Sequence, residues 1–548
     1  MPDAALIAPI RETLAAAARD LVGDAAPPVE LAAPANPEHG DLATPLAMAL
    51  ARPARRSPRE IAESLAEVLR DGGLVEGAEV AGPGFLNLTL PPAWFADAAA
   101  AVVSAGPDYG AGQADPAQDV HLEFVSSNPT GPLHVGHARH AAYGDSLGRI
   151  LGFAGHTVHR EFYVNDYGRQ MELFGASVAA RYGELAGVET PFPEDGYRGD
   201  YVAEIAARIR GEVGDAYRDA LDPLEPETLT FFALRGKDLM LEEIVADLER
   251  FRVRFDDFFS ETSLHVDGRV EAAVERLLEA GDAYEHEGAI WFATTRYGDE
   301  KDRVLRRADG TTTYIAPDVA YHLDKASRGH DVLINVLGAD HHGYVERLRA
   351  VLSAGGHEPA MLEVPLIQLV SLVEAGEARR MSKRAGTLVP LSDLLDDIGV
   401  DAARFFLVQR AHETGFDLDL DLARRQQREN PVYYSQYVHA RATNILERVT
   451  DEPPRRQPPE VEPAERALAL RLVDWPDAVR EAEERRAPHR VAVYLIDLAR
   501  DFHVFYERCR VIDAPDEVRA FRLDLVRGVR SVTGLGLALL GVEAPDRM

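Results

Sequence analysis

The hydrophobic positions along the chain divide it into three parts with different periodicities. Residues 1 to about 110 combine helical patterns with a strand-like run, GPGFLNLTL, at 82–90. Between about 119 and 420, short apolar runs that are typical of buried strands alternate with helical stretches. Residues 421–548 have helical periodicity almost throughout. The pattern therefore predicts a small α/β domain, a central α/β domain with a parallel sheet, and a C-terminal all-α bundle.

One helical stretch interrupts the alternation in the central part. RGDYVAEIAARI at 198–209 and LRGKDLMLEEIVADLERF at 234–251 both have helical spacing of apolar residues. They follow a strand pattern, HTVHREFYVND, at 156–166. We expect an inserted helical subdomain over about 170–285, between the two halves of the sheet.

Composition narrows the class of protein. The chain is 46% hydrophobic, which is enough for several cores, and no apolar run reaches the length of a membrane-spanning helix. The opening stretch, MPDAALIAPIRETLAAAARDL, has neither a basic start nor a cleavage site, so we expect no signal peptide and a cytoplasmic protein. Cys509 is the only cysteine, which excludes a disulfide within the chain and any multi-cysteine zinc site.

The charge is distributed unevenly. The whole chain carries a net charge of −32, whereas residues 401–548 contain 23 Arg against 26 Asp and Glu. Almost all of the negative charge therefore lies in the first 400 residues. Because phosphate contacts depend on Lys and Arg, the C-terminal part is where an anionic partner is repelled least.

The richest candidate chemistry lies at 123–137, EFVSSNPTGPLHVGH. A strand pattern ends there, Pro and Gly residues form a tight loop, and a helical pattern begins near His134. The N-terminus of a helix presents unpaired N–H groups and a partial positive charge, which suit a phosphate group. Gly136 lets a flat ring or a phosphate approach the backbone, and His134 and His137 could donate hydrogen bonds to phosphate oxygens. The simpler alternative is that the two histidines only cap the helix.

A second candidate is the basic stretch 379–387, RRMSKRAGT. The chain has 55 Arg but only four Lys, so its composition favours Arg wherever a plain positive charge suffices. Lys383 therefore indicates a role for a compact, movable charge, which can follow a phosphate group through a reaction. The alternative is a solvated loop charge.

A third set of candidates follows strand patterns further along the chain. Gly338 and Asp340 end the apolar run 332–340, and a glycine with a carboxylate at a strand end suits a ribose. Tyr314 and Asp318 lie four residues apart, so they share one face if a helix begins there. With Glu123 they would supply the carboxylates and aromatic hydroxyl that a guanidinium prefers, although a helix cap is the simpler role for Asp318.

These segments together resemble a known family. HVGH and RMSKR are similar to the HIGH and KMSKS signatures of class I aminoacyl-tRNA synthetases, and SSNPTGPLHVGHARHAAYGDSLGRIL resembles the arginyl-tRNA synthetases in particular. Further similar segments, such as HGDLATPLAMALA, YVNDYGRQM and NPVYYSQYVHARA, extend the resemblance over nearly the whole chain. Arg380 and Arg384 depart from the second signature, in which a lysine and a serine are usual.

The resemblance implies a division of labour among the domains. It implies an N-terminal α/β domain at 1–110 that contacts the tRNA elbow. A Rossmann-like catalytic domain follows at 119–420, and a helical anticodon-binding domain at 421–548. The inserted helices would handle the acceptor end of the tRNA.

The resemblance also implies roles for single residues. It makes His134, His137 and Lys383 catalytic, through contacts with phosphate groups. The ATP-binding residues would be His134, Gly136, His137, Gly338, Asp340, Met381, Ser382 and Lys383. The arginine-binding residues would be Glu123, Asn128, Tyr314, Asp318 and His341.

The activity that the resemblance implies is arginine–tRNA ligation. Arginine would react with ATP to give arginyl-adenylate and diphosphate, and the arginyl group would pass to the 3′-terminal adenosine of tRNA(Arg). We expect Mg²⁺ with ATP, no zinc or other metal site in the protein, no membrane partner and a monomer. Three rival hypotheses are a class I synthetase of other specificity, a smaller nucleotidyltransferase, and a non-catalytic relative that binds tRNA.

Overall fold

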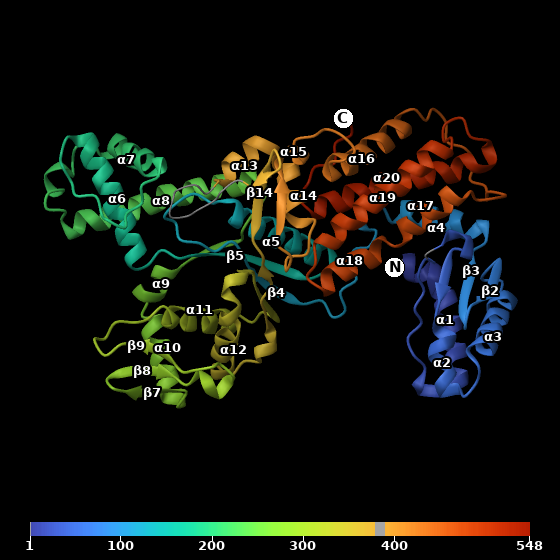
Figure 1. Ribbon diagram of the computed structural model, residues 1–548, viewed down its shortest axis with the longest axis horizontal. Helices are drawn as coiled ribbons and strands as arrows, with labels where there is room; N and C mark the ends of the chain where they lie inside the picture. The colour runs from blue at the N-terminus through green and yellow to red at the C-terminus, as the bar shows by residue number, and fades with distance from the viewer. Residues whose placement is uncertain (1, 35, 379–388) are drawn as a thin grey trace.

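The centre of the molecule is a five-stranded sheet in which every strand is parallel to its neighbours (Figure 1). The computed structural model describes residues 2–34, 36–378 and 389–548. The strands, in their order across the sheet, are β12 (Leu362–Glu363), β10 (Val332–Asn335), β4 (Asp119–Glu123), β5 (Thr157–Val164) and β6 (Asp257–Ser260). The predicted parallel-sheet α/β class is confirmed.

Two helices cover the two faces of this sheet. α5 (Val135–Ala154) lies on one face, where Gly144 allows close approach, since an added Cβ would lie 2.3 Å from Cγ of Phe124. α11 (Ile315–Ser327) lies on the other face, where Tyr321 and Lys325 reach side chains of β5 and β4. Because side chains alternate along a strand, His121 and Glu123 point towards α11, while Leu122 and Phe124 point towards α5.

The N-terminal module forms at one end of the molecule (Figure 1). Its sheet is antiparallel, in the order β1-β3-β2. Ser57 caps α3 in a reciprocal capping box with Glu60. The last helix of the module, α4, packs against α17 and α20 of the C-terminal bundle. The elements are α1 (Pro2–Val22), β1 (Leu42–Thr44), α2 (Leu46–Ala54), α3 (Pro58–Asp71), β2 (Gly77–Ala81), β3 (Phe85–Thr89) and α4 (Pro92–Ala105).

The inserted helices project from the sheet at the opposite end (Figure 1). They are α6 (Arg169–Ala186), α7 (Asp200–Val213) and α8 (Pro226–Arg250). The insertion was expected to extend to about 285, but the chain returns earlier, because β6 joins the main sheet beside β5. A four-residue edge strand whose side chains are only partly buried has no periodicity that distinguishes it from a loop.

A second hydrophobic core lies between the central sheet and α12 (Val345–Ala354). Two further helices and a small antiparallel sheet contribute side chains to this core, and so does α11. Its other elements are α9 (Glu261–Val266), α10 (Arg269–Ala280), β7 (Ala283–His286), β8 (Ala289–Phe292) and β9 (Arg303–Arg306).

The apolar run 332–340, expected as one strand, is broken. β10 ends at Asn335, and β11 (Leu337–Gly338) pairs instead with β13 (Leu366–Ile367) in a separate two-stranded ladder. A further small sheet follows, with β14 (Val370–Glu374) between β15 (Glu377–Ala378) and β16 (Phe416–Asp419). The break takes Gly338 out of the main sheet and into the ladder with β13.

The C-terminal part is the predicted helical bundle (Figure 1). None of the helices over the described residues combines the length and apolar character needed to cross a membrane. Two helices, α13 (Leu391–Ile398) and α14 (Val400–Val408), precede the bundle and belong to the central part, and α15 (Leu420–Ala423) lies at the boundary. The helices of the bundle are α16 (Pro431–Glu447), α17 (Pro463–Val473), α18 (Trp475–Glu484), α19 (His489–Arg508) and α20 (Asp516–Leu539).

Candidate active site

The helix start predicted at His134 is confirmed. His134 is the N-cap of α5 and accepts a hydrogen bond from the Gly136 N–H at 3.1 Å through Nδ1. The His134 N–H donates in turn to Nδ1 of His137 at 3.4 Å, and the two rings stack with their centroids 3.9 Å apart. Because Nδ1 accepts in both rings, an imidazole that is neutral at either position carries its proton on Nε2. The histidines therefore cap the helix, and their Nε2 atoms are the candidates for phosphate contacts.

Gly136 allows this arrangement for a steric reason. A Cβ at this position would lie 2.9 Å from Cε1 of His134, so a side chain would displace the ring. The glycine therefore lets the His134 ring lie against the first turn of α5, where Nδ1 accepts from the Gly136 N–H.

The second signature, with Arg379 to Thr387, lies outside the described residues. Three predicted site residues belong to this undescribed stretch, namely Met381, Ser382 and Lys383. The chain after the signature is described, and it pairs with the start of α5. The Val135 N–H donates to the Val389 carbonyl at 3.2 Å, and the Leu391 N–H donates to the Leu133 carbonyl at 2.8 Å. The C-terminal flank of one signature therefore lies directly against the other signature.

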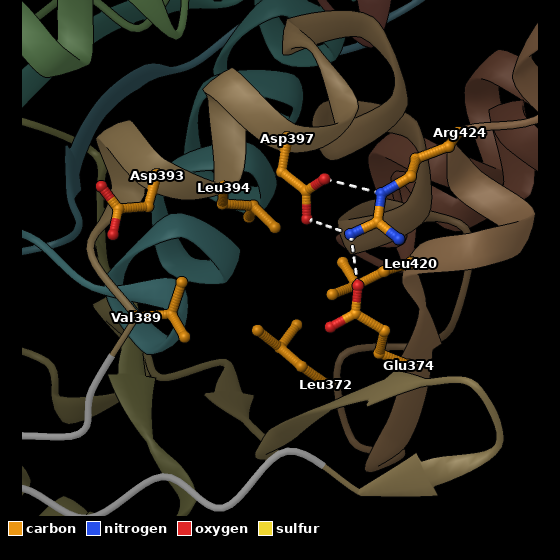
Figure 2. Close-up of a pocket in the computed structure, with 8 residues that line it drawn as sticks. All are labelled: Leu372, Glu374, Val389, Asp393, Leu394, Asp397, Leu420 and Arg424. Carbon is orange, nitrogen blue, oxygen red and sulfur yellow. Dashed lines mark hydrogen bonds and ion pairs between the residues drawn. The ribbon is translucent and has the colours of Figure 1, made fainter.

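Next to Val389 lies a small cavity of about 270 Å³ in which Arg424 is paired with two of the three carboxylates that line it (Figure 2). Arg424 binds Asp397 of α13 through Nε and Nη2 at 2.6 and 2.7 Å, and its Nη2 also reaches Glu374 of β14 at 2.8 Å. This arginine connects the strand before the signature to the helix after it.

Glu123 ends β4 and is held in the interior. Its Oε2 accepts a hydrogen bond from Lys325 Nζ at 2.7 Å, and its Oε1 accepts from Ser126 Oγ at 2.9 Å. Burial alone would raise the pKa of Glu123, but Lys325, His322 and the hydrogen bonds together lower it. Lys325 is fully buried and also donates to Asn335 Oδ1 at 2.7 Å. The carboxylate is therefore ionised and fixed in position.

Lys325→Met should be strongly destabilising, because it leaves the Glu123 carboxylate buried without its cation. We expect the free energy of unfolding to fall by roughly 3–5 kcal/mol. Urea denaturation measures this loss. Adding Glu123→Gln to the same protein removes the orphaned charge and should restore most of the stability, so equal losses in the single and double variants would contradict the pairing.

The backbone after Glu123 is strained. Val125 and Ser126 have positive φ angles of 71° and 23°, which cost about 1–3 kcal/mol each for residues of this kind. The turn is held by Ser126, whose hydroxyl also accepts from the Tyr163 N–H at 3.1 Å. The turn places Asn128 next to the end of β5, where the Asn128 side-chain amide donates a hydrogen bond to the Asn165 carbonyl at 3.0 Å. Asn128 thus lies at the carboxyl ends of two adjacent strands.

A pair of buried carboxyl groups, Asp318 and Glu261, lies at the same edge of the sheet. Asp318 is in the first turn of α11 and accepts a hydrogen bond from the Tyr344 hydroxyl. Glu261 begins α9 and is hydrogen-bonded to Tyr163. Burial raises the pKa of each to about 7, and for Asp318 the charge of Glu261 contributes to this rise.

Neither carboxyl has a Lys or Arg within ion-pair distance among the described residues. The nearest cationic candidate is His265, whose Nε2 lies 3.8 Å from Glu261, and burial lowers its pKa. Two buried acids without a counter-ion form a site with a high affinity for a cation. A planar guanidinium can satisfy both at once, because its donors lie in a fixed fork.

Tyr314 lies at the mouth of this carboxyl pair. It is the N-cap of α11, and its side chain is 66% exposed. Because the helix begins at Ile315, Asp318 lies one turn beyond Tyr314 and does not cap the helix. The structure therefore rejects the alternative of a capping role for Asp318.

The third predicted group is Gly338, which ends β11, with Asp340 and His341 in the 3-10 helix Ala339–Tyr344 that follows. A Cβ on Gly338 would lie 2.5 Å from Asp340 Oδ1, so a side chain there would displace the carboxylate. Asp340 is exposed, and His341 Nε2 lies 3.9 Å from its Oδ2. This segment faces α5 at His140, because Asp340 and His341 both act electrostatically on that histidine.

Sequence analysis missed several groups in this region. Burial and the charges of Arg139 and His134 lower the pKa of His140 to about 4, so it is neutral beside His134. The sequence position of His140 could have indicated a place in the site, since His140 lies three residues after His137. Glu261, Tyr163 and Tyr344 gave no local signal, because each reaches the site from a different element.

Comparison with known proteins identifies the family. The model of the family "tRNA synthetases class I (R), catalytic domain" matches residues 100–414. "Arginyl tRNA synthetase N terminal domain" matches residues 6–90, and "DALR anticodon binding domain" matches residues 435–548.

Individual relatives agree with these matches. An arginine–tRNA ligase of Shouchella clausii is 46% identical over 534 residues, covering 95% of each chain. That of Bacillus subtilis is 44% identical over 530 residues, again covering 95% of each chain. The solved arginyl-tRNA synthetase of Thermus thermophilus superposes with a TM-score of 0.78 at 26% identity, covering 99% of this chain and all of that one. The chain therefore belongs to the arginine–tRNA ligases of class I.

Proposed function

We propose that this protein activates L-arginine with ATP and transfers it to tRNA(Arg). The observation that carries the proposal is the buried pair Asp318 and Glu261. It lies at the carboxyl ends of the parallel strands, where such sheets bind ligands, and it has no cationic partner among the described residues. Of the amino-acid side chains, the arginine guanidinium matches two carboxyl groups best.

The two steps need no covalent bond to the enzyme. In the first step a carboxylate oxygen of arginine attacks the α-phosphorus of ATP, and the bond to the β-phosphate oxygen breaks, releasing diphosphate. In the second step a ribose hydroxyl of the terminal adenosine attacks the arginyl carbonyl carbon, and AMP leaves. Catalysis then depends on positioning the reactants and on stabilising phosphate charge.

The site residues divide between the two substrates. His134 and His137 donate to the phosphates, Gly136 lies against the adenine, and Gly338 and Asp340 bind the ribose. Lys383, with Met381 and Ser382 beside it, binds the leaving diphosphate. ATP enters as its Mg²⁺ complex.

Arginine binds at the end of β4. Asp318 and Glu261 hold the guanidinium, and Tyr314 covers it. Glu123, Asn128 and His341 surround the rest of the amino acid. The chain of hydrogen bonds from Lys325 through Glu123 to Ser126 fixes this end of the site.

The tRNA contacts extend over the remaining domains. The N-terminal module at 1–110 meets the tRNA elbow, and the bundle at 421–548 meets the anticodon. The catalytic domain at 119–420 receives the acceptor end beside the inserted helices. We further propose that the enzyme works as a monomer in the cytoplasm.

Amino-acid-dependent ATP–diphosphate exchange, with and without tRNA(Arg), tests the proposal. We expect exchange with arginine and not with lysine or citrulline, and we expect it to require tRNA. Exchange with a different amino acid would overturn the specificity. A folded protein that binds tRNA but supports no exchange would instead be a non-catalytic relative.

The raised pKa values of Asp318 and Glu261 predict a pH dependence of arginine use. Arginine binds the ionised carboxylates, so KM for arginine should fall as pH rises through about 7 and then level off. Below this pH, each carboxyl that has to ionise contributes up to about a tenfold change per pH unit. KM for arginine, measured by exchange across this range with KM for ATP as the control, checks the prediction. A flat arginine profile would contradict it.

A further inference from the structure

A cluster of imidazoles lies in the layer of side chains next to Glu123, on the face of the sheet that α11 covers. His121 of β4 and His159 of β5 are directly paired across the strands, and Glu161 follows two residues later on the same face. The candidate ligand atoms of these three residues all lie within 4.8 Å of one another. His330, just before β10, lies against both, with ring centroids 5.2 Å from His121 and 5.9 Å from His159.

One ring nitrogen of His121 has no hydrogen-bond partner. The side chain is completely buried, and Nδ1 makes no hydrogen bond. Nε2 faces Glu161 Oε1 at 3.2 Å. Leaving a buried polar nitrogen unsatisfied costs about 1–3 kcal/mol, and such exceptions in folded proteins need an explanation.

We propose that His121, His159 and Glu161 bind a divalent transition-metal ion, with zinc as the best match. Two imidazoles and one carboxylate are a common donor set for zinc. Around a tetrahedral zinc, ligand atoms lie about 3.4 Å apart, given bond lengths of about 2.0–2.2 Å. His159 is only half-buried, so its ring has room to rotate and close this distance.

The surroundings provide the outer contacts that metal sites typically have. His330 Nδ1 lies 2.7 Å from Asp119 Oδ1, which fixes the ring, and the contact of this ring with the other two imidazoles makes His330 a candidate fourth ligand. Glu161 is oriented by the Tyr321 hydroxyl at 2.6 Å and by Arg328 at 2.6 Å.

The neighbouring cations do not exclude a metal ion, because each is already neutralised. Arg328 is bound by Asp324 at 2.6 Å, and Lys325 is bound by Glu123 at 2.7 Å. An ion here would join β4 to β5 and, through His330, to the start of β10. Its role would be structural, since it lies behind Glu123 and not at the phosphate site.

The proposal departs from the expectation that the protein has no metal site. His121 and His159 are 38 residues apart in the sequence and match no metal-binding spacing. Only the parallel pairing of β4 with β5 brings them together.

Cobalt and zinc binding to the full-length, tag-free protein tests the proposal. After treatment with a chelator, we expect one Co²⁺ per chain, with a visible spectrum typical of nitrogen and oxygen ligands and displaceable by Zn²⁺. We also expect Zn²⁺ to raise the temperature of unfolding.

His159→Gln is the decisive variant, because a half-buried side chain can be replaced without emptying the core. It should weaken metal binding at least about tenfold and abolish the thermal shift by Zn²⁺. His286→Gln, on the exposed surface of β7, is the matched control and should bind as the parent does. Parent protein that binds no metal at micromolar concentrations would overturn the proposal. So would binding that persists unchanged in His159→Gln, which would place the ion elsewhere, for example at His134 and His137.

Discussion

Asp318→Asn should lower kcat/KM for arginine by about two to four orders of magnitude. Losing one partner of a desolvated, charged hydrogen-bonded pair costs roughly 3–5 kcal/mol. The guanidinium lies far from the reacting carboxylate, so most of the loss should appear as a higher KM for arginine, with KM for ATP unchanged. Arginine-dependent exchange measures both constants.

This variant should also be at least as stable as the parent above neutral pH. The pKa of Asp318 is raised to about 7, so ionising it costs folded-state stability as pH rises from the unfolded value towards 7. Asparagine removes that cost. Lost activity together with unchanged or increased stability to urea would separate a role in binding from a role in folding.

A matched control lies nearby on the same segment. Glu346 is an exposed residue of α12, paired with Arg349 and two residues after Tyr344. Glu346→Gln should leave the kinetics unchanged. Glu261→Gln should resemble Asp318→Asn, and the double variant should lose less than the sum, because both carboxyls hold the same group. A normal KM for arginine in both single variants would contradict the assignment of the carboxyl pair.

His137→Asn should lower kcat by about a hundredfold to a thousandfold, with little change in KM for arginine. Removing one preorganised donor to a developing phosphate charge typically has an effect of this size. The asparagine oxygen can still accept from the His134 N–H, as Nδ1 does, so the helix cap is retained while the outer N–H is lost. Single-turnover formation of arginyl-adenylate isolates the affected step.

Glutamine distinguishes the two functions of this histidine. His137→Gln carries an amide N–H near the position of Nε2, so it should recover part of the lost rate. His286→Asn, at an exposed position of β7, serves as the control for histidine replacement in general. Equal rates for His137→Asn and the parent would show that the ring only caps the helix.

Local sequence determined those parts of the site that lie within one short stretch. Breakers between a strand pattern and a helical pattern predicted the loop and the start of α5, and the helix begins at Val135 with His134 as its cap. Tyr314 and Asp318 were placed one turn apart by spacing alone, and α11 starts at Ile315. Hydrogen bonds within a few residues govern these features, so the sequence carries their signal.

The tertiary structure alone decided which distant groups meet. Glu261 joins Asp318, Lys325 neutralises Glu123, and His121 faces His159, although each pair comes from different elements. The same holds for β6, an edge strand recognised only by its pairing with β5. The physical reason is that parallel strand pairing and burial are non-local. Periodicity shows which face of an element is apolar, but the partner of a buried charge depends on how the elements pack.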